Sequence, residues 1–141
     1  MTTYYMNEAA FALPEGEVAD RTVTQIVLDA GGGESILLGV HRRPFPAGAS
    51  LAVVVAESQR DADRALPSHA VLFQREAEIG GAFALETAAQ WRGDDGMLYS
   101  RHAHVVLDGV WLMFVGNSPL GARAACDAHL DRLVATFRRR G

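Results

Sequence analysis

The segment LYSRHAHVVLDGVWLMFV, residues 98–115, decides the fold that we predict for this chain. Two strand-like runs, Leu98–Leu107 and Val110–Val115, flank Asp108 and Gly109, a two-residue turn typical of a β-hairpin. Two further runs precede this hairpin, with a glycine pair (80 and 81) between them and a Gly-Asp-Asp-Gly turn (93–96) after them: Ala70–Glu78 and Phe83–Trp91. The second half of the chain is therefore predicted to be an antiparallel β-meander.

Another hairpin, called the first hairpin below because it comes first along the chain, is predicted ahead of the meander. The β-branched run Thr22–Leu28 and the run Ser35–His41 flank the glycines at 31–33. Between this hairpin and the meander, apolar residues recur at near-helical spacing after Ser50, which is a suitable N-cap, and Pro67 ends the pattern.

Another helix is predicted after the meander, with Ser118 as its cap and Pro119 at its first position. Arg138, Arg139 and Arg140 would close it, where positive charge suits a helix C-terminus. Its apolar stripe, typical of a core-facing helix, is Cys126, Leu130, Leu133, Val134 and Phe137. Preceded by a punctuated stretch at 4–13, these elements predict an α+β fold in which helices pack on an antiparallel β-sheet.

The composition predicts one globular domain over residues 1–141. Of the 141 residues, 49% are hydrophobic, which is enough to form a core. The formal net charge of −4 argues against a nucleic-acid partner. No apolar run approaches the roughly 18 residues that a membrane helix requires. The first residues, MTTYYMNEAAF, lack the basic and apolar regions of a signal peptide, so we expect a cytoplasmic protein.

No catalytic constellation stands out in the sequence. Cys126, the single cysteine, lies on the apolar stripe of the last helix, where an inert core thiol is expected. The glycines at 31–33 lack the lysine and helix of a phosphate-binding loop. The acidic residues are interpreted as a solvated helix face and a turn: Asp61, Asp63, Asp94 and Asp95. We therefore expect no enzyme activity and no cofactor.

His102 and His104 are two residues apart on a predicted strand, so they project to the same face. Such a pair can contribute two metal ligands, but no third ligand follows at a metal-binding spacing. A polar, solvated strand face is the favoured interpretation.

The first hairpin has apolar residues on both faces. Its predicted core face holds Ile26, Leu28, Ile36, Leu38 and Val40. An antiparallel sheet with helices on one side should be mostly polar on the other side. The opposite face instead mixes apolar and hydrogen-bonding groups: Val23, Gln25, Val27, Leu37, Gly39 and His41. Either the N-terminal strand or the last helix covers this face, or it binds a ligand or a partner.

Several segments, spread over nearly the whole chain, resemble the DcrB-related Eag chaperones of type VI secretion. They are YMNEAAFALP (5–14), DRTV (20–23), RRPFP (42–46), QRE (74–76), QWR (90–92) and LVATFR (133–138). The resemblance implies a PsbP-like α+β fold, a homodimer, and no catalysis. Eag proteins are cytoplasmic adaptors that shield the N-terminal transmembrane segments of effectors carrying a PAAR domain, before the effector is loaded onto the VgrG spike.

The resemblance also implies an effector-binding groove. It places groove residues on the second face of the first hairpin, among them Val23, Gln25, Leu37, Gly39 and His41, with Val27 on the same face. It places polar groove positions near Gln59 and His102. The competing hypothesis is a small-ligand or metal-binding protein of the same fold that uses His41, His102 and His104.

Overall fold

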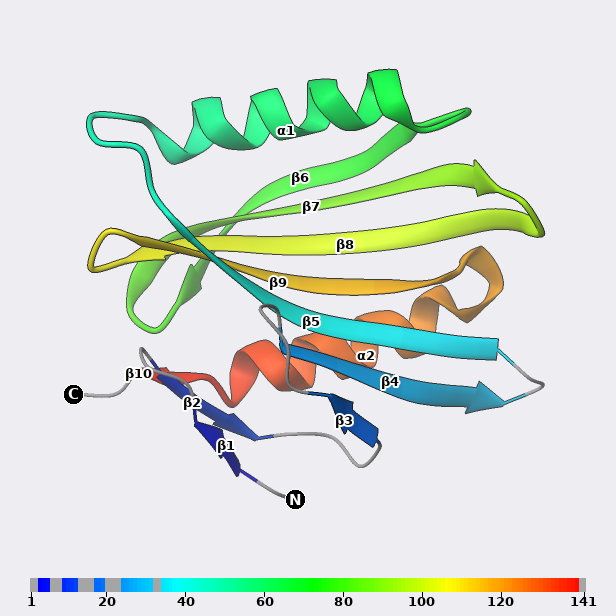
Figure 1. Cartoon of the computed structure of the whole chain (residues 1–141), viewed down its shortest axis with the longest axis horizontal. Coiled ribbons are helices and arrows are strands. Elements are labelled where there is room, and N and C mark those ends of the chain that lie inside the picture. The colour runs from blue at the N-terminus through cyan, green and yellow to red at the C-terminus, as the bar shows by residue number, and fades with distance from the viewer. Residues whose placement is uncertain (1–2, 6–8, 13–16, 20–23, 32–33, 140–141) are drawn as a thin grey trace.

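A computed structural model describes residues 3–5, 9–12, 17–19, 24–31 and 34–139, with side chains from residue 35 to residue 137. A seven-stranded antiparallel sheet, in the order β3-β4-β5-β9-β8-β7-β6, forms the middle of the molecule (Figure 1). A small sheet, β1-β2-β10, lies beside it. The strands are β1 (Thr3–Tyr5), β2 (Ala9–Ala12), β3 (Glu17–Ala19), β4 (Thr24–Gly31), β5 (Glu34–Pro44), β6 (Ala70–Ile79), β7 (Ala82–Gly93), β8 (Gly96–Leu107), β9 (Val110–Pro119) and β10 (Arg138–Arg139).

The predicted first hairpin is confirmed as β4 and β5. Ile26 pairs with Leu38 and Leu28 with Ile36, and the ladder closes at Gly31 and Glu34. Ile36 and Leu38 are fully buried, and Val40 is nearly so, as the predicted core face requires. Ile26 and Leu28 were also predicted for the core face, but they lie outside the residues whose side chains the structure describes. The stretch at 4–13, predicted as one run, contains the two paired strands β1 and β2.

The predicted meander is confirmed as β6, β7, β8 and β9, with each strand antiparallel to the next. β9 also pairs with β5, which joins the first hairpin to the meander in one sheet. Both glycines of the turn between β6 and β7, Gly80 and Gly81, have positive φ angles, a conformation that glycine adopts without steric cost.

The predicted start of the second helix is wrong. β9 continues through Pro119, a 3-10 helix spans Leu120–Ala122, and α2 runs from Arg123 to Ala135. Ser118 and Pro119 pair with Tyr99 and Leu98 of β8, and the Ser118 hydroxyl donates to the Pro119 carbonyl at 2.9 Å instead of capping a helix. The neighbouring strand therefore holds these residues in extended conformation, overriding the local Ser-Pro signal.

The apolar stripe of α2 is confirmed, whereas its predicted arginine end is wrong. Cys126, Leu130 and Leu133 are buried, as is Phe137 just beyond the helix, while Val134 is half-buried. The helix ends at Ala135, and Arg138 and Arg139 form β10 against β2. Arg140 lies outside the described residues.

α1 (Leu51–Ala65) begins where predicted, with Ser50 at the N-cap position. The Ser50 side chain makes no capping hydrogen bond, although its carbonyl accepts from the Val54 amide at 3.1 Å. Val55 is the one fully buried residue of this helix, and Val53 is 54% exposed. In the described part of the chain, no helix has the length and apolar character needed to span a membrane.

α2 packs on the sheet face opposite to α1, where a buried ion network joins it to the strands. The Arg101 guanidinium is 3% exposed and contacts Glu86 at 3.1 Å and Asp131 of α2 at 2.5 Å. Tyr99 donates to Asp127 of α2 at 2.6 Å, and burial raises the pKa of its phenol. Charged partners thus compensate the cost of burying Arg101 beside the apolar core.

Candidate functional site

The α1 face of the large sheet, the face over which α1 lies, collects side chains from the first hairpin and from the meander. Residues paired across neighbouring strands lie on the same face, so the register places them in rows across β5, β9 and β8. The rows are Leu37–Asn117–Ser100, Gly39–Val115–His102 and His41–Met113–His104.

Most of the predicted groove residues come together on this face. Leu37 and His41 are half-buried, and Gly39 is buried. His102 is half-buried and lies in the same row as Gly39, with Val115 between them. Gln59 approaches from α1 and lines the same cavity as His102. On β4, the backbone pairs Gln25 with Gly39 and Val27 with Leu37. Val23 lies outside the described residues.

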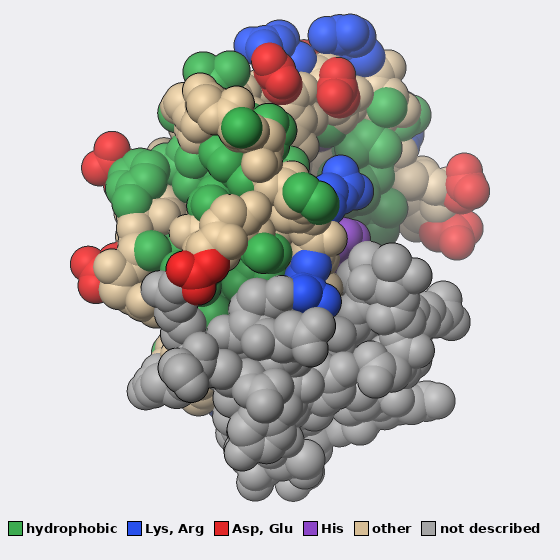
Figure 2. Space-filling model, turned by 60° about the vertical axis from the view of Figure 1, so that its left-hand side comes forward, with side chains coloured by type: hydrophobic (Ala, Val, Ile, Leu, Met, Phe, Trp, Pro, Cys, Tyr) green, Lys and Arg blue, Asp and Glu red, His purple; other side chains and the backbone are tan. Residues whose placement is uncertain are grey.

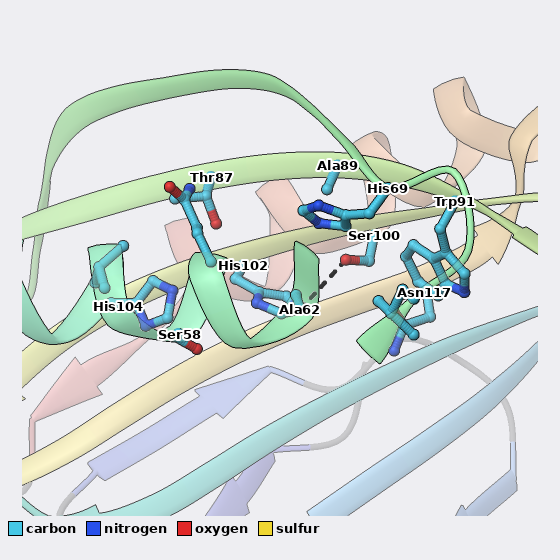
Figure 3. Close-up of a pocket in the computed structure, with 13 residues that line it drawn as sticks. Ser58, Ala62, His69, Thr87, Ala89, Trp91, Ser100, His102, His104 and Asn117 are labelled. Atoms are coloured by element: carbon cyan, nitrogen blue, oxygen red, sulfur yellow. Dashed lines mark hydrogen bonds between the residues drawn. The ribbon is translucent and has the colours of Figure 1, made fainter. Parts of the chain in front are cut away.

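A cavity of about 140 Å³ lies between α1 and the sheet (Figure 3). Apolar groups and neutral hydrogen-bonding groups surround it. Its lining residues are Val55, Ser58, Gln59, Ala62, Leu66, His69, Thr87, Ala89, Trp91, Ser100, His102, His104 and Asn117. The Gln59 amide nitrogen is buried and has no hydrogen-bond partner among the described residues. The cavity therefore contains a donor whose hydrogen-bonding capacity is unused.

A second, more open hollow of about 550 Å³ adjoins the cavity, and both are lined by Trp91 and Asn117. It extends to Leu37 and Ser35 at the start of β5. These two shared residues make the spaces neighbours. Together the adjoining spaces, called the depression below, reach from beneath α1 to Leu37 of the first hairpin. Leu37 and Gln59, distant in the sequence, thus border one depression.

His104 corrects the prediction of a solvated histidine pair. Its side chain is among the fully buried ones, 1% exposed, and stacks on Trp111 with ring centroids 5.7 Å apart. The Trp111 indole N–H donates to His104 Nδ1 at 3.2 Å. His102 lies edge-on to His104, 5.8 Å between centroids, and its Nε2 is 3.3 Å from the Ser100 hydroxyl. Sequence alternation gave the correct face, but α1 shields this part of the face from water.

The histidines of the α1 face are neutral near pH 7. Burial, assisted by the charge of neighbouring His41, lowers the pKa of His102 to about 4. Burial, assisted by His102, lowers the pKa of His104 to about 3. Burial and then the charge of Arg43 lower the pKa of His41. His41, His102 and His104 thus supply polar but neutral groups to the α1 face, a combination that accommodates apolar ligands.

The geometry does not favour the metal-binding hypothesis. Because His104 Nδ1 accepts the indole proton, Nε2 carries the imidazole proton, and neither nitrogen has a free lone pair for a metal. The described residues include no group of three or more His, Cys, Asp or Glu side chains that could hold a metal ion.

Cys126 lies on the opposite face, fully buried against Gly116, and burial raises the pKa of its thiol to about 11. A thiol that is rarely ionised is a poor nucleophile. Among the acidic residues predicted to be solvated, Asp61, Asp94 and Asp95 are exposed. Asp63 is also exposed but binds His69 Nδ1 at 2.7 Å beside the cavity.

Sequence reasoning missed several residues of the depression. Trp91, Thr87 and Ala89 alternate in the sequence and so lie on one side of the predicted strand, but nothing in the sequence indicates that α1 covers them. Asn117 directly precedes the predicted helix cap Ser118, and this wrong prediction conceals its place on β9. The signal that could have found it is its register with Ser100.

Apolar side chains also gather outside the depression. Figure 2 shows one side of the molecule, where hydrophobic side chains form a broad patch with acidic and arginine side chains at its margins. Phe83 and Val71 on the meander are 55% and 46% exposed. Large exposed apolar areas are typical of interaction surfaces.

The fold and the site define a class of protein: an α+β domain of PsbP-like fold whose sheet is packed tightly by one helix and loosely by the other. Residues 8–136 match the DcrB family, and the chain belongs to this family. No curated protein matches the sequence.

Solved structures support the fold. A Pseudomonas aeruginosa protein of unknown function, PA94, is similar over 100% of this chain and 98% of its own, with a TM-score of 0.77 and 20% identity. Cyanobacterial PsbP from Synechocystis sp. PCC 6803 is similar over 99% and 92%, with a TM-score of 0.66 and 12% identity. LpqN of Mycobacterium tuberculosis, involved in cell envelope biogenesis, is similar over 99% and 90%, with a TM-score of 0.69 and 10% identity.

Proposed function

We propose that this DcrB-family protein is a cytoplasmic chaperone and adaptor of type VI secretion. It binds and shields the N-terminal transmembrane helices of an effector that carries a PAAR domain, and it aids loading of that effector onto the VgrG spike. The proposal includes no catalytic step and no cofactor. It rests on the resemblance of the sequence to Eag chaperones and on the properties of the α1 face.

The observation that carries the proposal is the depression formed by the two adjoining spaces at the α1 face. It joins Leu37 of the first hairpin to Gln59 of α1 and His102 of β8. An apolar helix in water needs a concave apolar surface to cover it. Hydrogen-bonding side chains within such a surface can replace the polar contacts that neighbouring helices make in a bilayer.

Leu37→Asp tests the proposal because it puts a charge where the apolar helix would lie. Burying an unpaired carboxylate is costly, so we expect loss of effector binding. The measurement is co-purification of the neighbouring effector's N-terminal segment with each variant. Ala124→Asp, at an exposed position of α2 on the other side of the sheet, is the matched charge control and should bind like the wild type.

Circular dichroism of both variants separates binding from folding. Leu37 is only half-buried, so we expect the Leu37→Asp protein to remain folded. A folded Leu37→Asp protein that still retains the effector segment at the wild-type level would refute the groove assignment. Gly39→Leu provides a second variant, which blocks the same row by volume and adds no charge.

A further inference from the structure

The cavity beneath α1 has the size of a small-molecule site. Its volume is about 140 Å³. An engineered apolar cavity of about 150 Å³ in another protein binds benzene, so a single ring or a branched aliphatic group fits this space. Val55, Ala62 and Ala89 supply an apolar wall, and Trp91 lines the same space.

One hydrogen-bond donor at the cavity is buried and unpaired. The Gln59 amide nitrogen is buried without a partner in the described part of the chain. His104 accepts the Trp111 indole proton at Nδ1, so its proton is on Nε2, and this residue lines the cavity as well. Leaving a buried donor unpaired costs free energy, which a ligand oxygen would recover.

The cavity has no charged partner to offer a charged ligand. No Arg, Lys, Asp or Glu is among its lining residues, and His69 is engaged by Asp63 at 2.7 Å. An ion entering this space would lose its hydration without gaining a counter-ion. The lining therefore selects a neutral group.

We propose that the cavity between α1 and the sheet binds a compact neutral group of about one ring in size, whose single oxygen acceptor pairs with the Gln59 amide. A free small molecule and a side chain of a bound partner can both supply this group. The inference goes beyond effector shielding, because it concerns recognition of a small group at the inner end of the depression, beneath α1, rather than coverage of a whole helix. It stands on the cavity alone.

Cyclohexanone is a suitable probe, and methylenecyclohexane has the same shape without the oxygen. We expect saturable binding of cyclohexanone to the full chain, detected by ligand-observed NMR and by intrinsic tryptophan fluorescence, to which Trp91 contributes. Ala62→Leu fills the cavity and should abolish binding. Ala65→Leu, exposed at the end of the same helix, should not. Absence of saturable binding to the wild type, or equal binding to the Ala62→Leu protein, overturns the proposal.

Gln59→Met tests the acceptor recognition with nearly the same side-chain volume. The ratio of ketone to hydrocarbon affinity should fall roughly threefold to tenfold, the range for one hydrogen bond. An unchanged ratio refutes the role of Gln59. This comparison stays informative if Ala62→Leu fails to fold.

Competition identifies the source of the group. If cyclohexanone displaces the effector's N-terminal segment, a partner side chain occupies the cavity. If both bind at once, a free molecule does. Because probe binding is measured on the protein alone, its outcome is independent of whether the effector proposal holds.

Discussion

At the scale of single residues, His104 shows how neighbouring rings control a titratable group. The Trp111 indole fixes its tautomer through Nδ1, and the two rings stack. Burial then removes the water that would stabilise the imidazolium. The folded protein consequently holds a neutral histidine whose pKa is about 3.

This arrangement predicts acid sensitivity. The unfolded chain binds protons at His102 and His104 near pH 6.5, whereas the folded chain binds them only near pH 4 and pH 3. Between pH 6.5 and pH 4 the unfolded state therefore carries more protons, and the free energy of unfolding falls as the pH is lowered. Each histidine contributes up to about 1.4 kcal/mol per pH unit in this window.

Urea unfolding of the His102→Gln/His104→Gln protein at several pH values checks this prediction. Its free energy of unfolding should depend less on pH than that of the wild type. Ala124→Gln, at an exposed position of α2 that carries no titratable group, is the control and should keep the wild-type dependence. Equal slopes for all three proteins between pH 6.5 and pH 4 would show that the buried pair does not titrate as described.

At the scale of elements, the spacing between α2 and the sheet depends on Gly116. A Cβ atom at this position would lie 2.9 Å from the Cys126 sulfur, closer than side-chain atoms pack. β9 therefore needs glycine where α2 crosses it. The same contact explains why α2 places a small thiol on its buried stripe.

Gly116→Ala should lower the free energy of unfolding by about 1–3 kcal/mol, the usual cost of overpacking a filled core. Removing the sulfur with Cys126→Ala should relieve the contact, so Gly116→Ala should cost less in that background than in the wild type. A double-mutant cycle by chemical denaturation measures this coupling. Strict additivity of the two substitutions would contradict the proposed contact.

The elements also show what the sequence could predict and what it could not. Period-two alternation and Asp108-Gly109 correctly indicated the meander, because strand pairing and tight turns are local in the chain. The predicted start of the helix after it is wrong, because pairing with β8 holds Ser118 and Pro119 in a strand despite the local helix-start signal. α1 packs over β7 and β8 through contacts between residues far apart in the sequence. Such contacts leave no local signal, so the sequence did not predict the cavity.

At the scale of the whole molecule, the two sheet faces differ in how they are covered. The α2 face is filled by apolar side chains and by the Arg101 ion network. The α1 face keeps a depression and a buried donor without a partner. A further apolar patch lies on the outer surface (Figure 2). Such an unequal distribution is typical of a protein that covers part of its surface with another chain.

We expect a homodimer in solution, on the strength of this apolar surface and the resemblance to Eag chaperones. Light scattering at micromolar concentration should give twice the chain mass of 15.2 kDa. Leu37→Asp and Phe83→Asp proteins, measured in parallel, would show whether the depression or the exposed Phe83 side chain on β7 holds the two copies together. A wild-type mass near that of one chain would contradict the prediction.

The single fully buried side chain of α1, Val55, has a consequence for local stability. Three buried side chains and an ion network secure α2, so the two helices should not detach with equal ease. α1 can open as a separate cooperative unit while the sheet and α2 stay folded. Its amide protons should exchange with deuterium well before those of β8 and β9. We therefore expect sub-global fluctuations to uncover the α1 face at a lower cost in free energy than global unfolding.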